Sequence, residues 1–253
     1  MKRTLFACLI LALCAGSVFA QKAKPWTEWS KKDAEKMLND SAWARTQEDT
    51  DITQLFYSPG SNETITKTTA GRSDDRGVGT GTNESGAKNQ ALSLKYRIRF
   101  MSAKPVRQAF ARAIVLTQAK DEQAAKMLGA KLQGAFVDLD YGDYIVVAVA
   151  FEATDRRLSG PVEQALRSST ADTLKNTCYL ERKDGKRMFL VEYQQPTPDQ
   201  TGAKFIFQRT LDGQPFLTAE NEIVRFVAVV GEKVKLNMKY KTADMIYDGK
   251  LEY

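Results

Sequence analysis

Residues 144–151 read Tyr-Ile-Val-Val-Ala-Val-Ala-Phe, an almost unbroken apolar run in the second half of the chain. A strand that is buried on both faces has this character, because neither face alternates with polar residues. We therefore expect a central strand here, with other layers of the protein packed on both of its sides.

A second strand is predicted upstream of this run. Apolar residues alternate with polar ones at Leu92, Leu94, Tyr96, Ile98 and Phe100. Strict alternation is typical of a strand that buries one face and exposes the other. The sequence thus predicts a half-buried strand over residues 92–100.

Helices are expected on both sides of the central strand. Pro105 suits the first turn of one helix, and a second helix is predicted over residues 121–133, with Gly134 as its end. After the central strand, Pro161 is expected to open a short helix over residues 161–166.

The last third of the chain carries four turn signals, namely Asp184-Gly185, Asp212-Gly213, Gly231-Glu232 and Asp248-Gly249. Each suits a two-residue loop between antiparallel strands. Such loops would pair Leu180 with Phe189, and Val229 with Val234. The series predicts a meander or sandwich in which Cys178 faces the apolar side and Val224 the mostly polar side.

Residues 1–20 have the parts of a secretory signal peptide. Met1-Lys2-Arg3 is basic, a short apolar stretch follows, and Ala20 is the small residue before the expected cleavage point. The apolar stretch is far shorter than the roughly 20 residues that span a bilayer. Lipidation at Cys14 is the less favoured alternative, because Leu13 is larger than the residue that normally precedes a lipidated cysteine. We expect an exported protein, periplasmic or extracellular.

The composition excludes several classes of function. The chain of 253 residues has no histidine, which excludes Ser-His-Asp and Cys-His catalysis and HExxH zinc sites. Removal of the signal peptide would leave Cys178 as the one cysteine, so we expect no internal disulfide. The formal net charge is +6, from 37 basic and 31 acidic residues that are interleaved along the chain. This interleaving is typical of a solvated surface and not of a nucleic-acid interface, and no transmembrane segment is expected in the mature chain.

We divide the exported part of the chain into three segments. Residues 21–57 form an N-terminal helical unit, in which Ser30 and Asp33 resemble a capping box and residues 50–57 have the character of a strand. Residues 58–89 have too few large apolar side chains to offset their ordering entropy, so we expect a polar flexible loop or linker. Residues 90–253 form the main domain.

The predicted fold class is therefore α+β. It comprises a helical N-terminal unit, a mobile polar loop, and antiparallel strands with interspersed helices. The C-terminal third is expected to be sandwich-like.

All three tryptophans, Trp26, Trp29 and Trp43, lie close together near the start of the expected mature chain. One interpretation is that they anchor the helical unit onto the main domain. The other is that they form an aromatic platform for a protein partner or a glycan, since large aromatic residues are common anchors of interfaces.

Three carboxylates, Asp138, Asp140 and Asp143, surround Gly142 just before the central strand. Calcium prefers several oxygen ligands, so these residues are a candidate metal site. Their spacing is not that of an EF-hand, and Asp and Gly also simply favour a turn into a strand. No other cofactor is expected.

Two stretches of the sequence resemble a known group of proteins. PWTEWSKKDAEKMLNDSAW at residues 25–43 and MIYDGKLEY at residues 245–253 are similar to the ends of a group of exported bacterial proteins of unknown function. The resemblance implies a shared architecture and supplies no catalytic residue, substrate or cofactor.

The functional expectation is an exported, non-catalytic binding or interaction protein of the cell envelope, whose partner is an unidentified protein or glycan. One alternative is a histidine-free hydrolase of envelope polymers that uses Asp and Glu side chains. The other is a module that binds calcium or a small ligand. The sequence does not specify an oligomeric state.

Overall fold

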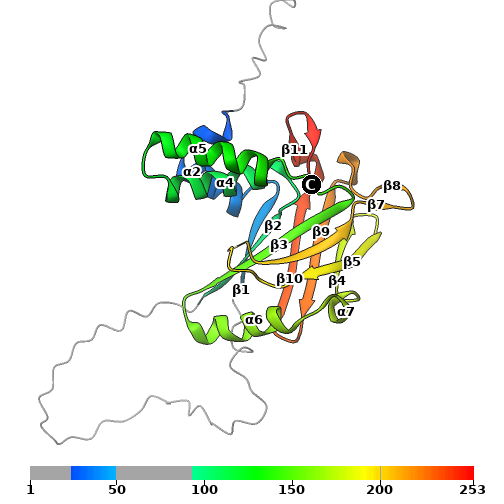
Figure 1. Ribbon diagram of the computed structural model, residues 1–253. Coiled ribbons are helices and arrows are strands. Elements are labelled where there is room, and N and C mark those ends of the chain that lie inside the picture. The colour runs from blue at the N-terminus through cyan, green and yellow to red at the C-terminus, as the bar shows by residue number, and fades with distance from the viewer. Residues whose placement is uncertain (1–23, 50–92, 200) are drawn as a thin grey trace, which may run out of the picture.

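The computed structural model describes residues 24–49, 93–199 and 201–253 (Figure 1). The predicted signal peptide, the strand expected at residues 50–57 and the polar loop expected at residues 58–89 lie outside these described residues. No described helix is long and apolar enough to cross a membrane.

The described chain is dominated by one antiparallel sheet of eight strands, in the order β1-β2-β3-β6-β5-β4-β9-β10. Its strands are β1 (Ala44–Asp49), β2 (Leu94–Phe100), β3 (Tyr144–Ala153), β4 (Cys178–Arg182), β5 (Arg187–Gln194), β6 (Ala203–Gln208), β9 (Ile223–Val230) and β10 (Val234–Lys241). Two small hairpins, β7 (Thr210–Leu211) with β8 (Gln214–Pro215) and β11 (Ile246–Tyr247) with β12 (Lys250–Leu251), lie outside it. The α+β class with antiparallel strands is confirmed.

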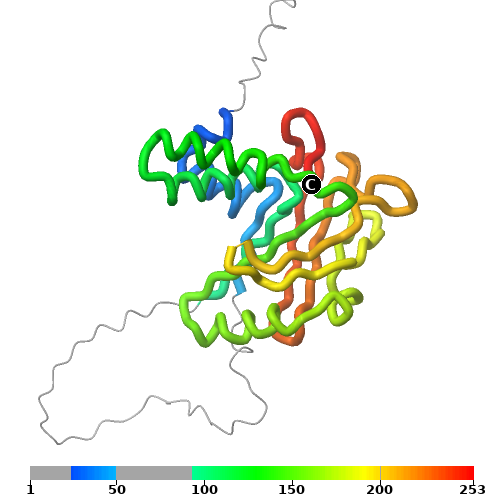
Figure 2. Tube along the Cα trace, viewed as in Figure 1, coloured from blue at the N-terminus to red at the C-terminus, as the bar shows by residue number. Residues whose placement is uncertain are grey.

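The sheet curls so that its two edge strands, β1 and β10, almost meet (Figure 2). The side chain of Gln47 in β1 bridges the remaining gap. Its amide nitrogen donates to the carbonyl of Lys235 at 2.8 Å, and its amide oxygen accepts from the backbone N–H of Asn237 at 3.0 Å. The Tyr240 hydroxyl of β10 also donates to the carbonyl of Ile98, at 2.9 Å. Side chains thus complete a closure that backbone pairing leaves unfinished.

The hydrophobic core fills the inside of this curled sheet. Its large and fully buried side chains include Tyr96, Phe100, Phe205, Phe207, Phe226 and Tyr240. The Phe226 ring lies 5.4 Å from that of Phe205 and 6.2 Å from that of Phe207, both edge to face. Such pairs are favourable beyond the area that they bury.

The apolar run at residues 144–151 forms the first part of β3, as predicted. Every residue from Ile145 to Val149 is buried, on the inner and the outer face alike. Strand β2 is also confirmed, because Leu94, Tyr96, Ile98 and Phe100 are all fully buried.

Helices lie at both ends of the curled sheet (Figure 1). They are η1 (Trp26–Glu28), α2 (Lys31–Asn39), α4 (Lys104–Gln118), α5 (Glu122–Leu132), the π-helix η2 (Gln133–Val137), α6 (Arg156–Ser168), α7 (Ala171–Leu174), η3 (Ala219–Asn221) and η4 (Thr242–Asp244). The group formed by η1, α2, α4 and α5 lies at one end, and α6 lies at the other.

Three predicted helix boundaries can be compared with the structure. Pro105 lies in the first turn of α4, as predicted. The stop expected at Gly134 is wrong, because the chain continues through the π-helix η2 to Val137. The start expected at Pro161 is also wrong, because α6 begins at Arg156 and Pro161 lies inside it.

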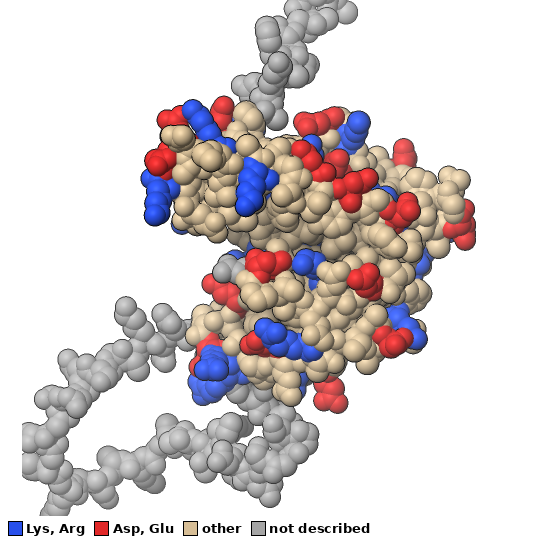
Figure 3. Space-filling model, in the orientation of Figure 1, with Lys and Arg blue, Asp and Glu red and all other residues tan. Residues whose placement is uncertain are grey.

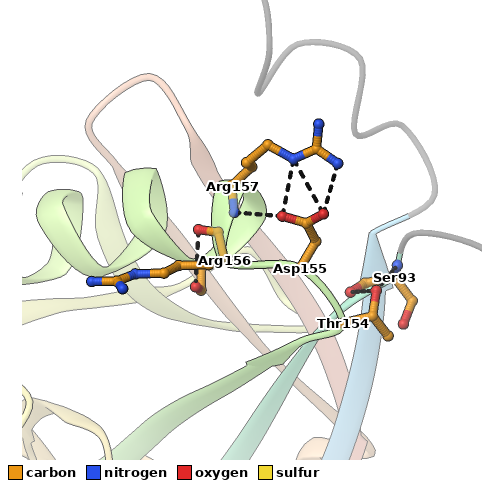
Figure 4. Close-up of polar contacts among 6 residues, drawn as sticks. Ser93, Thr154, Asp155, Arg156 and Arg157 are labelled. Carbon is orange, nitrogen blue, oxygen red and sulfur yellow. Dashed lines mark hydrogen bonds and ion pairs between the residues drawn. The ribbon is translucent and has the colours of Figure 1, made fainter.

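The earlier start of α6 has a local cause in Asp155, the residue before its first turn (Figure 4). The Asp155 carboxylate accepts from the backbone N–H of Arg157 at 2.8 Å and from its guanidinium at 2.7 Å. The hydrogen bonds from the Arg157 guanidinium have the largest effect on the pKa of Asp155, and the bond from the Arg157 backbone N–H adds to it. Together they lower this pKa from its ordinary value of 3.8 to about 2. Next to it, the Thr154 hydroxyl accepts from the Ser93 N–H at 3.0 Å and ties the ends of β2 and β3 together.

The N-terminal helical unit is joined to the sheet more closely than the sequence indicated. The residues after Trp43 form β1, which pairs with β2 from Ala44 to Asp49. The Trp43 indole is buried in the core and donates to the carbonyl of Glu252 at 2.7 Å. The N- and C-terminal ends of the described chain are therefore held together.

Two of the four predicted hairpin turns have the expected form. Asp212-Gly213 and Asp248-Gly249 are two-residue loops in which all four residues have positive φ. This is the requirement of a type I′ turn.

The other two hairpins have three-residue loops, so the predicted pairings are wrong by one residue. Leu180 pairs with Met188, and Val230 pairs with Val234. In the first loop Gly185 has a φ of +82°, a conformation that favours glycine after a turn of this length. Val224, expected on the polar side, is consequently buried in the core.

We predict that Asp155→Asn lowers the free energy of unfolding near neutral pH. Asn still accepts the Arg157 N–H, but it loses the charge that pairs with the guanidinium. Folding lowers the pKa of Asp155, so the ionised carboxylate stabilises the folded state. This contribution to the free energy of unfolding is present above about pH 4 and is lost as the pH falls to about 2. Urea unfolding of both proteins over this range should show the difference between them shrinking to zero. A difference that stays constant with pH would contradict the assignment.

We predict that Phe226→Ala destabilises the fold by about 3–5 kcal/mol, because a buried ring is replaced by a cavity. Phe189→Ala removes the same ring from a position that is 44% exposed, and it should cost far less. Chemical denaturation of both variants measures the contrast. Equal losses of unfolding free energy in the two variants would show that Phe226 does not lie at the centre of the core.

Candidate functional site

The candidate site is a groove between η1, α4 and α5, which we call the helical groove. Its volume is about 880 Å³, within the range of sites that bind small molecules or parts of larger ones. The side chains that line its floor are mostly small or apolar and include those of Trp26, Val115, Leu116, Ala119, Ala125 and Ala130.

Small residues of α5 make the groove hollow. Ala125 and Gly129 lie four residues apart and so share one face of the helix, with Ala130 beside them. A Cβ atom built on Gly129 would lie 3.9 Å from the end of the Trp26 ring. Larger side chains on this face would therefore fill the space that the groove now offers.

Trp26 forms one wall of the groove and is fixed there. Its indole N–H donates to the Oε1 atom of Gln133 at 2.7 Å, and its side chain is only 6% exposed. Leu116, another residue of the lining, remains 40% exposed although it is a large apolar residue. The groove thus offers a rigid aromatic edge and an exposed aliphatic one.

The rim of the groove carries both signs of charge in equal number. Its basic residues are Arg112, Lys120 and Lys126, and its acidic ones are Glu28, Asp121 and Glu122. Several of these groups already have partners in the fold. Lys126 pairs with Glu122 at 2.8 Å, and Asp121 accepts from the N–H of Ala124 at 2.7 Å. The face of the molecule seen in Figure 3 is likewise interleaved, without a large patch of one sign.

The structure does not bring the three tryptophans together as a platform. Trp43 is 5% exposed and lies in the core, where its ring meets that of Tyr247 edge to face at 6.1 Å. Trp29 is half-buried, and its indole N–H donates to the carbonyl of Lys24 at 2.9 Å. Only Trp26 lines the groove. Trp26 and Trp43 are buried against other elements of the described chain, as the anchoring interpretation expects, and a role of the tryptophans in binding a partner stays a prediction.

The three aspartates before β3 are not arranged as a metal site. Asp138 accepts from the Gln133 side-chain amide at 2.8 Å and pairs with Lys104 at 3.2 Å. Asp140 accepts from the backbone N–H of Gly142 at 2.8 Å, which forms the turn itself. Across residues 24–49, 93–199 and 201–253, no group of three His, Cys, Asp or Glu side chains could hold a metal ion. The contact of Asp140 with Gly142 is that of a turn, and calcium binding at Asp138, Asp140 and Asp143 stays a prediction.

The helical groove was not identified from the sequence. Its floor depends on Ala119, Ala125 and Ala130, and alanine is also the commonest filler of ordinary helices. The one available signal was the run of small residues on one face of the helix predicted over residues 121–133. Without a partner element to pack against, that run does not distinguish a groove from a close helix contact.

Comparisons with known proteins do not assign a family. No family model and no curated protein matches the chain. Among solved structures, a protein of unknown function from Burkholderia pseudomallei matches with a TM-score of 0.35 and 8% sequence identity. The match covers 58% of this chain and 74% of that one.

Cys178 is a buried nucleophile outside the groove. Its thiol is fully buried on the inner face of β4, as predicted, where the residue pairs with Ala228 of β9. Burial raises the pKa of the thiol from its ordinary value of 9.0 to about 11. The thiolate is the reactive form, so this cysteine is inert in the folded protein.

We predict that Cys178 resists alkylation until the protein unfolds. In a chain with Cys8→Ser and Cys14→Ser, an aromatic disulfide reagent near neutral pH should label almost no thiol natively and one thiol in denaturant. The rate should rise with denaturant in parallel with unfolding. Labelling of the native protein at the rate of a free thiol would show that this side of the core opens easily.

Proposed function

We propose that the protein is an exported, non-catalytic binding protein of the cell envelope, and that the helical groove receives an apolar peptide segment of a protein partner. The observation that carries this proposal is the groove itself, with its apolar floor, its rigid Trp26 wall and the exposed Leu116. Exposed apolar surface with a polar rim is characteristic of interaction sites.

The chemistry of the groove supports a peptide more than a polar small molecule. The one buried polar group of its wall, the Trp26 indole N–H, is already bonded to Gln133. The groove therefore has no unused buried donor that would select a specific polar ligand. Two or three apolar side chains of a peptide would instead be bound by burial, and the mixed charges of the rim would tolerate the polar groups around them.

Export is supported by the sequence of residues 1–20, and the non-catalytic character by the lack of histidine in the whole chain. Within the groove, the acidic pair Asp121 and Glu122 is engaged in helix capping and in an ion pair. Neither is positioned as an acid–base pair facing an empty site.

We predict that a photo-crosslinking amino acid at position 116 captures a discrete partner in living cells, because Leu116 lies at the open edge of the groove. The variant Ala130→Phe should abolish the capture, since a ring on this face fills the groove. The matched control Gln123→Phe places the same ring on an exposed position of α5 that does not line the groove, and it should leave capture unchanged. Mass spectrometry of the crosslinked peptide identifies the segment that is bound.

The outcomes separate the proposal from its alternatives. Capture that survives Ala130→Phe would show that the partner does not enter the groove. A crosslinked glycan or lipid in place of a peptide would contradict the predicted class of partner. Circular dichroism and thermal unfolding verify that both phenylalanine variants remain folded.

A further inference from the structure

A second surface lies on the outside of the sheet, where β5, β4, β9 and β10 run side by side. We call this surface the basic wall and define it by the outward-facing side chains of these four strands. Their inward-facing neighbours, such as Leu180, Phe226 and Leu236, are buried in the core. Since side chains alternate along a strand, the residues between them face outward.

One row of the basic wall is apolar. In register, Phe189 lies opposite Tyr179, and Tyr179 lies opposite Val227. The rings of Phe189 and Tyr179 are 5.7 Å apart. Phe189 is 44% exposed, and its outward neighbour Val191 is 45% exposed, so two large apolar side chains project next to each other.

The adjacent row is charged and contains one acid. Glu181 lies between Arg187 and Arg225, with its oxygens 2.8 Å from one guanidinium and 3.5 Å from the other. Arg187 also lies over the Tyr179 ring, at 4.5 Å. The single carboxylate thus has two cations beside it, and their charges are only partly compensated.

The edge strand β10 adds a row of lysines. Lys235, Lys239 and Lys241 are exposed and project outward, with Asn237 between them. No ion pair joins any of the three to another residue of the described chain. With the two arginines they give the wall five cations against two acids, Glu181 and the exposed Glu192 of β5.

From this combination we propose that the basic wall binds the surface of an anionic lipid bilayer. The charges of the wall complement the charges of anionic head groups, and Phe189 and Val191 can enter the head-group region between them. The proposal does not depend on the function proposed for the helical groove, which lies on other elements of the fold.

The kind of cation favours a bilayer over an acidic protein. A lysine is a flexible, strongly hydrated point charge, whereas recognition of fixed carboxylates more often uses the planar fork of arginine. In the basic wall both arginines already contact Glu181, and the uncompensated charges are the three lysines of β10. Their long side chains can follow mobile head groups, and their stems can lie along the apolar row.

The test measures how much of the protein, residues 21–253, sediments together with each of two kinds of vesicle. One is pure phosphatidylcholine, and the other contains about one third phosphatidylglycerol. We expect binding to the anionic vesicles only, weakening as salt is added because the attraction is screened. The triple variant K235Q/K239Q/K241Q should weaken the affinity for anionic vesicles by roughly 100-fold, since each lysine near an anionic surface contributes a similar amount of binding free energy.

A matched variant distinguishes a local surface from overall charge. K32Q/K36Q/K131Q removes the same charge from exposed positions of α2 and α5, and it should reduce binding only slightly. Phe189→Ser should weaken binding several-fold without changing its dependence on salt.

Equal losses in the two triple variants would overturn the proposal in favour of net charge. Equal binding to both kinds of vesicle, or binding to neither, would also overturn it. The lysines could instead serve only to protect the edge of the sheet from pairing with another chain. In that case the unmodified protein would not bind vesicles, and the variant K235Q/K239Q/K241Q would aggregate. Thermal unfolding of each variant verifies the fold.

Discussion

From β2 to β10 the inner face of the sheet is lined mainly by apolar side chains, and the structure depends on keeping that face from water. The rings of Phe205, Phe207 and Phe226 meet at its centre. A flat sheet would need a second layer to cover them, whereas this sheet curls so that its own strands supply the cover. Where curling stops short of full closure, the amide of Gln47 replaces a peptide group and bridges β1 to β10.

The helical unit depends on this closed core. Strand β1 connects α2 to the sheet, and Trp43, the residue before it, donates to the carbonyl of Glu252 near the C-terminus. Arg99 of β2 strengthens the contact, because its buried guanidinium donates to the carbonyl of Leu38 at the end of α2. The groove between η1, α4 and α5 therefore has a fixed support. A preformed groove requires less ordering when a ligand binds, which favours affinity.

Much of the fold could be predicted from the sequence, because periodicity and turn chemistry act locally. The apolar run of β3, the alternation of β2 and the Asp-Gly turns at 212–213 and 248–249 are examples. Hairpin register could not be predicted in β4–β5 and β9–β10. In these strands both faces carry apolar residues, for instance Met188 inside and Phe189 outside, so a shift by one residue leaves the pattern plausible. Strand β1 was missed because its sequence is polar and it forms only by pairing with β2.

The functional surfaces were less predictable than the fold. The sequence groups the three tryptophans, yet the structure buries Trp43 in the core and leaves only Trp26 in the lining of the groove. The groove depends on small side chains, and the basic wall depends on which residues of four strands share one face. Both are properties of packing and register, which a single sequence specifies only through the complete fold.

Amide hydrogen exchange of the purified protein tests most directly the claim that the groove is a preformed part of one body. If the claim holds, the amides of α4 and of the Gly129 region of α5 exchange as slowly as those of β3, because all of them open only on global unfolding. If α4 and α5 exchange rapidly while β3 stays protected, the helical unit opens by itself. The groove would then be formed by its partner and not by the fold.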